Sequence, residues 1–296
     1  MRTMKAFMAS TLLLAGSLVS GITQAGYYYE ATSVTQSDGG SAQTTKVNAW
    51  SEGPATRIEF TEGDSMGVFG PGSYLISTDS GETLWVVNPA KKTYSAFDPG
   101  ELLNTADEMM KSMGDMLEMN IVDTHFDKVS EQPGEKLLGY ATQRVEFTSG
   151  YTVSIKVLGQ TMNQVFDSKQ TLWAAPAVDA SAMSAWLRPD KLMKGMFKGV
   201  GDLVEKHMNA IQGAPLKSVV ETKATGGMGG DSTTVITTEV TTLRKESVDA
   251  AKFQIPDDYT ETSLMDEVAG DDATQEAGNG LQEGMSKLKG LFGGQN

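Results

Sequence analysis

The stretch ATRIEFT, at residues 55–61, alternates between polar and apolar side chains from Arg57 onward. Ile58 and Phe60 fall on one face of an extended chain, and Arg57 and Glu59 fall on the other. Because successive side chains of a β-strand point to opposite faces, this pattern predicts an antiparallel strand with one buried and one wet face. The Gly53-Pro54 pair before it marks a turn.

Short segments of the same kind extend in both directions from this one. Aromatic and β-branched runs separated by turn sequences predict strands at 27–36, 43–52, 74–78, 83–88 and 93–97. Strands return at 121–173, where Val153, Ile155 and Val157 alternate with polar residues. A last hairpin is expected from 216–223 and 232–245, with the glycine-rich 226–230 at its tip.

Two stretches change to the helical period. Pro99–Met119 carries an apolar stripe, which predicts a methionine-rich amphipathic helix. Asp179–Ile211 is predicted to be helical in two pieces, because Pro189 interrupts it. Half-wet strands need a cover on one face, and these helices can provide it. The residues therefore predict the α+β class, with helices covering one face of an antiparallel sheet.

The N-terminus has the features of a signal peptide. Arg2 and Lys5 precede an apolar run at 6–19, and Thr23-Gln24-Ala25 offers small residues for cleavage after Ala25. The run is shorter than the roughly 20 residues of a membrane span, so the mature chain is expected to be periplasmic and not membrane-spanning, with an uncleaved anchor as the alternative. We expect a signal peptide at 1–25, one domain at 26–262, and a mostly disordered acidic tail at 263–296, in which Leu281–Phe292 is expected to form a short amphipathic helix.

The amino-acid composition limits the kinds of site that the chain can form. The chain has no cysteine, which excludes disulfides, thiolate metal sites and cysteine nucleophiles. Its formal net charge is −14, and loss of the two signal-peptide cations makes it more negative, so a nucleic-acid partner is not expected. His125 and His207 lack metal-ligand spacing, and no Gly-x-Ser-x-Gly elbow is present. We therefore predict a protein that is not an enzyme and has no cofactor.

Methionine spacing is the sharpest chemical candidate. Met110, Met113, Met116 and Met119 are three residues apart, and thioethers suit Cu(I). Each step along a helix slips back by about 60°, so Met110 and Met119 would point in opposite directions. Apolar lining is the better interpretation, because methionine fills cores and adaptable binding surfaces. No metal site is predicted, and Cu(I) binding stays open as a minor alternative.

Several segments together resemble the periplasmic lipoprotein-carrier-like (LolA/LolB-like) half-barrel proteins. The resemblance lies in Trp85–Pro89 with Lys92–Tyr94, Leu137–Tyr140 with Gln143–Val145, Ala214–Lys217, and Phe253–Pro256 with Tyr259. It implies a strongly curved antiparallel β-sheet, an incomplete barrel, with helices covering the concave face. In those carriers the hollow holds lipid acyl chains.

These observations lead to two hypotheses of function. The first is a periplasmic binding or carrier protein for a hydrophobic ligand, a lipid or an acyl chain. Its proposed lining consists of apolar residues from the two expected helical regions, namely Met110, Met113, Trp186, Met193, Met196 and Phe197. The second is a structural or interaction module that presents its sheet or acidic tail to another envelope protein.

Overall fold

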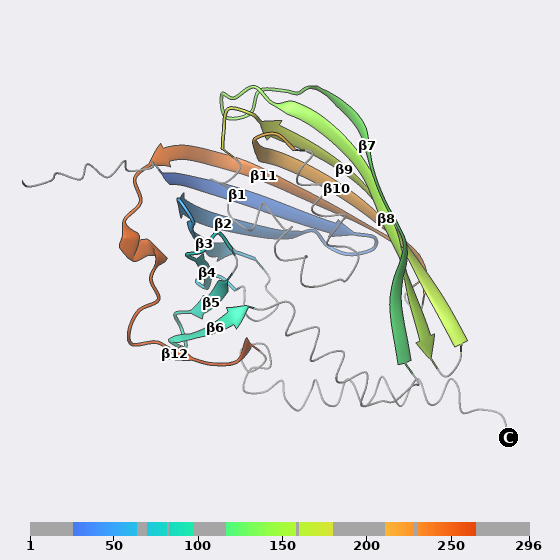
Figure 1. Ribbon diagram of the computed structural model, residues 1–296, viewed down its shortest axis with the longest axis horizontal. Coiled ribbons are helices and arrows are strands. Elements are labelled where there is room, and N and C mark those ends of the chain that lie inside the picture. The colour runs from blue at the N-terminus through green and yellow to red at the C-terminus, as the bar shows by residue number, and fades with distance from the viewer. Residues whose placement is uncertain are drawn as a thin grey trace, which may run out of the picture.

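The computed structural model describes residues 26–63, 70–81, 83–97, 117–157, 160–179, 211–227 and 230–264. These residues form one twelve-stranded sheet in the order β12-β6-β5-β4-β3-β2-β1-β11-β10-β9-β8-β7 (Figure 1). The strands are β1 Gly26–Ser37, β2 Gln43–Glu52, β3 Ala55–Glu62, β4 Tyr74–Ser77, β5 Leu84–Asn88, β6 Thr93–Phe97, β7 Leu117–Pro133, β8 Gln143–Val157, β9 Gln160–Ala175, β10 Ala214–Gly226, β11 Ser232–Glu246 and β12 Thr260–Glu261.

Two connections in this sheet are not local. β1, the first strand, pairs with β11, the last long strand, in the interior of the sheet. β12 adds to the edge strand β6 in parallel, whereas the other neighbouring strands run antiparallel. The segment between β11 and β12, which contains the 3₁₀ turn η2 at Ala250–Phe253, therefore crosses the sheet from its middle to its edge.

The sheet is strongly curved, and we call its concave side the inner face and its convex side the outer face (Figure 1). The main core lies on the inner face, where register places Ala49, Ile58, Leu75 and Val86 in one row across β2–β5. Phe60 lies in the next row and is 2% exposed. The predicted strand at 55–61 is confirmed, and its apolar residues face this core.

The outer face of β3–β6 is covered by the segment that follows β11. Tyr74, Ile76 and Val87 form a second buried cluster, against which Ile255 and Tyr259 pack. Consecutive residues such as Leu75 and Ile76 are therefore both buried, one on each face. We call β2–β6 with β12 and this covering segment the clasped half, and β7–β11 the long half.

The predicted α+β class, with helices covering the concave face, is wrong. The described residues contain twelve strands and one 3₁₀ turn, with no α-helix and no helical cover over the sheet. The methionine-rich helix expected at Pro99–Met119 is corrected in the same way, because Leu117–Met119 belongs to β7 and pairs with Ile155–Val157 of β8. Apolar residues at this end satisfy a strand as well as a helix, and pairing with β8 decides between them.

Other predicted segments lie largely outside the described residues. These are the signal peptide at 1–25, residues 98–116 and 180–210 of the expected helical regions, and the tail from 265 onward. Gly26 is the first residue of β1, directly after the expected cleavage site. Leu264, just past β12, is buried against the inner-face core. The domain division at 26–262 and 263–296 stays a prediction.

Candidate ligand-binding face

Charge separates the two faces of the sheet over β8–β10 and most of β11. Strand register assigns every charged residue of β8–β10, and of β11 as far as Val240, to the outer face. These residues are Arg144, Glu146, Lys156, Asp167, Lys169, Lys217, Glu221, Lys223 and Glu239. Over the same described residues the inner face carries no charged side chain. An ion is costly to remove from water, so an uncharged face can be covered by apolar matter at low cost.

β9 shows this separation most clearly. From Thr161 to Lys169 its outward side chains are exposed and its inward side chains are half-buried. Asp167 and Lys169 point outward, whereas Met162 and Phe166 point inward. The inner face is thus the less polar and the better covered side of the same strand.

An apolar strip runs along the inner side of β8 and β9. The rings of Tyr151 and Phe166 stack across the two strands, with centroids 5.0 Å apart and planes 20° from parallel. Val153, Ile155 and Met162 continue the strip away from the core. Burial raises the pKa of the Tyr151 hydroxyl above its ordinary value, so this phenol stays neutral at physiological pH.

The strip begins at a small buried cluster. Phe126 and Phe147 stack with centroids 5.1 Å apart, and Val145 and Leu172 are buried beside them. The cluster is the buried end of the apolar strip in β8 and β9. Beyond it, inward side chains change from buried to half-buried.

Neutral polar pairs occupy the middle of the inner face. Ser33 and Thr238 lie 3.1 Å apart, oxygen to oxygen, and Ser168 and Thr222 lie 2.9 Å apart. In each pair one hydroxyl donates to the other across neighbouring strands. Val220 and Ile236 lie between the two rows, and Ile236 is 38% exposed. The inner face of β8–β10, and of β11 as far as Val240, is therefore lined by apolar side chains, hydroxyls and the amides of Gln164 and Gln170, without charge.

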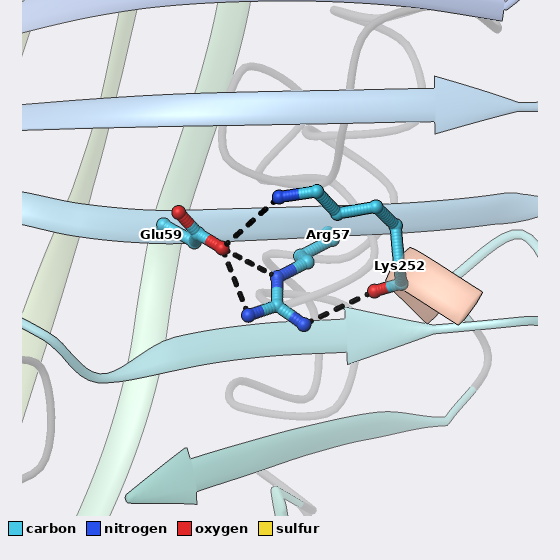
Figure 2. A network of polar contacts seen from close by, with 3 residues as sticks. All are labelled: Arg57, Glu59 and Lys252. Carbon is cyan, nitrogen blue, oxygen red and sulfur yellow. Dashed lines mark hydrogen bonds and ion pairs between the residues drawn. The ribbon is translucent and has the colours of Figure 1, made fainter. Parts of the chain in front are cut away.

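The outer side of the clasped half has the opposite chemistry, as Figure 2 shows. Arg57 donates from Nε to Glu59 at 2.8 Å and from Nη1 to the Lys252 carbonyl oxygen at 3.1 Å. Its guanidinium carbon lies 3.6 Å from the centre of the Tyr74 ring, and the Lys252 ammonium lies 4.0 Å from that of Trp50. These contacts fasten the covering segment to β2–β4, so this face is closed by the chain itself.

Tyr28 extends this network of the outer face. Its hydroxyl donates to Glu30 at 2.7 Å, and the Arg244 guanidinium lies 4.4 Å from its ring centre. Burial, together with the hydrogen bond to Glu30, raises the pKa of Tyr28 to about 12. The same hydrogen bond lowers the pKa of Glu30. The pair is arranged for a neutral phenol and an ionised carboxylate.

The residues proposed from the sequence as ligand lining are not brought together in the described part of the chain. Met110, Met113, Trp186, Met193, Met196 and Phe197 all lie outside it, and so does His207. His125 is exposed on the outer face, with its ring over Gly150. Among the described residues there is no cluster of three or more His, Asp or Glu side chains that could hold a metal ion.

Sequence reasoning missed most of the inner-face residues of the long half, including Tyr151, Phe166, Val220 and Ile236. Val153 and Ile155 were identified by their alternation, and the structure confirms that they share a face. The signal for the others was charge at every second position, as at Asp167 and Lys169 in β9. Such a pattern marks the wet face and thereby identifies its opposite.

No helix in the described residues is long and apolar enough to cross a membrane. The chain matches no protein-family model and no curated protein.

Three solved structures are similar to the chain. One is an uncharacterised conserved protein from Thermus thermophilus, with a TM-score of 0.32 and 8% identity over 79% of this chain and 90% of that one. Another is PNGF-II, with a TM-score of 0.31 and 13% identity over 82% of this chain and 33% of that one. The third is a LolA superfamily protein from Nitrosomonas europaea, with a TM-score of 0.29 and 9% identity over 78% of this chain and 90% of that one, and it comes from the group whose resemblance the sequence motifs indicated.

Proposed function

We propose that the protein is an exported, non-catalytic binding or carrier protein for a hydrophobic ligand, a lipid or an acyl chain. One observation carries the proposal, namely the separation of charge between the faces of β8–β11. A surface exposed only to water gains nothing from excluding charge from one face. A surface that receives apolar matter gains, because burial of apolar area is favourable and burial of unpaired charge is not.

The inner face of the long half supplies the proposed site. The half-buried Tyr151, Val153 and Phe166, together with the exposed Ile236, leave apolar area available, whereas the core beside Ile58 is already closed. The six residues named from the sequence, Met110, Met113, Trp186, Met193, Met196 and Phe197, remain proposed as further lining.

Binding of the neutral dye N-phenylnaphthylamine tests the proposal with matched neighbours in β9. Phe166 points inward, and Val165 points outward and is 37% exposed. Phe166→Asp should abolish the fluorescence gain of the dye, and Val165→Asp should leave it unchanged. Circular dichroism establishes that both variants fold. If Phe166→Asp fails to fold, Ile236→Asp and Val235→Asp make the same comparison in β11.

Two results would contradict the proposal. One is an intact protein that binds no dye and carries no lipid when it is analysed by native mass spectrometry directly from the cell. The other is an equal loss of dye binding in inward and outward variants. Export is tested separately: the protein released by osmotic shock should begin at Gly26, and a chain that retains residues 1–25 would contradict periplasmic release.

A further inference from the structure

The charge-free inner face also implies a selection among ligands, and this step rests on the proposed function. We propose that the inner face of β8–β11 takes only the uncharged part of its ligand and discriminates against ionised amphiphiles of either sign. A charged group placed there would lose water without gaining an opposite charge. The hydroxyl pairs Ser33–Thr238 and Ser168–Thr222 cannot replace that charge, because a neutral hydroxyl offers a dipole and not an opposite charge.

Charged residues do occur at the borders of this face, and their positions support the selection. On the edge strand β7, Lys128 and Glu131 lie opposite inward-facing residues of β8, and they form an ion pair with each other. Lys245 lies opposite Tyr27 near the end of β11, beyond the bulge in that strand. Lys128 is the edge-strand end of the row that continues through Phe147 and Gln170 to Val220 and Ile236, and Glu131 pairs with its charge. Within β8–β10, and in β11 as far as Val240, the rows are therefore neutral, and inward-facing charge is confined to the edge strand β7 and the end of β11.

Neutrality of the ligand is distinct from hydrophobicity. Decanol, decanoate and decyltrimethylammonium share one chain length and differ in the charge of the head group. A face that responds only to apolar area would bind the three with equal affinity once the buried chain is the same. A face that excludes charge binds decanol at least about tenfold more tightly than either ion, because each ion must stay partly hydrated at the rim.

A single lysine should narrow the selection against the anion and widen it against the cation. Ile236→Lys places an ammonium in the middle of the inner face, and Val235→Lys places the same group on the outer face one residue away. Competition of the three ligands against N-phenylnaphthylamine measures the relative affinities. We expect Ile236→Lys to improve decanoate relative to decanol about threefold to fivefold, as a half-exposed ion pair does, and to weaken decyltrimethylammonium. Val235→Lys should leave the affinity ratios of the three ligands as they are in the original protein.

The outcomes separate this inference from the proposed function. Failure of the intact protein to bind the dye or any of the three ligands contradicts the proposed function. Binding of all three with equal affinity contradicts the selection and leaves the carrier function in place. An equal response of the Ile236→Lys and Val235→Lys variants also contradicts it, because the charge of the inner face would then not matter. If Ile236→Lys does not fold, Val220→Lys with Val219→Lys supplies the same pair in β10.

Discussion

The clasped half and the long half belong to one sheet but are closed in different ways. In β4 all four residues are buried, since the core covers the inner face and the segment after β11 covers the outer face. In β9 exposed and half-buried residues alternate from Thr161 to Gln170, before the buried Leu172. Local stability follows buried apolar contacts, and binding surfaces come from the less stable parts of a fold. The comparison assigns stability to the clasped half and is consistent with the proposed ligand-binding face in the long half.

The largest expected effect contrasts one phenylalanine from each half. Phe60→Ala should lower the free energy of unfolding by about 3–5 kcal/mol, because it leaves a cavity in the closed core. Phe166→Ala should cost about 1 kcal/mol, because that ring is only half-buried. Urea titration of both variants measures the difference. Equal losses would show that the long half contributes to stability as the core does.

A glycine in β8 tests how closely the long half is packed on its outer face. A Cβ at Gly150 would lie 2.4 Å from His125 Cε1 and 2.8 Å from the Phe166 carbonyl oxygen. We expect Gly150→Ala to destabilise the protein by about 1–3 kcal/mol. Adding His125→Ala should recover part of this loss, since the backbone contact with Phe166 remains. Full recovery, or none, would contradict the packing described.

Loss of the polar contacts that hold the covering segment against β2–β4 should lower the stability of the protein moderately. Arg57→Leu removes the hydrogen bonds to Glu59 and to the Lys252 carbonyl, together with the contact on Tyr74. A loss of about 1–2 kcal/mol is expected in thermal unfolding. Lys92→Met is the matched control, because its ion pair with Asp258 is exposed and should contribute nothing measurable. If the control loses as much stability as Arg57→Leu, burial does not distinguish the two contacts.

The smallest expected effect is a pH dependence in the alkaline range. The pKa of Tyr28 is raised to about 12 in the folded protein and lies near 10 in an unfolded chain. Its contribution to stability is therefore complete below pH 10 and is lost as the pH rises toward 12. Tyr28→Phe should flatten this decline in chemical denaturation, and Tyr74 and Tyr151, whose pKa values burial also raises, should account for the remainder. An unchanged slope would contradict the assignment to Tyr28.

Local sequence patterns predicted many of the strands, but they did not predict how the segment after β11 covers the outer face of the sheet. The alternation at 55–61 identified β3 and the faces of Ile58 and Phe60, because a strand's side-chain period is visible in its own residues. The addition of β12 to β6, and the contact of Lys252 with Trp50, join segments far apart in the chain. No local period encodes such contacts.

The prediction for the start of β7 was wrong for a related reason. Leu117–Met119 continues an apolar pattern that fits a helix, and only its partner strand Ile155–Val157 shows that the chain is extended there. The candidate face was only partly predictable. Val153 and Ile155 were visible as apolar alternation, whereas Ile236 sits among threonines whose inward or outward direction depends on register with β10 and β1.

Labelling of a single introduced cysteine tests the central claim most directly, because the chain has no other cysteine. An environment-sensitive fluorophore is attached to Ile236→Cys on the inner face or to Val235→Cys on the outer face, and decanol is titrated into each. The charge-free inner face predicts a saturable blue shift at position 236 and no change at position 235. No response at position 236, or equal responses at both positions, would contradict binding to the inner face.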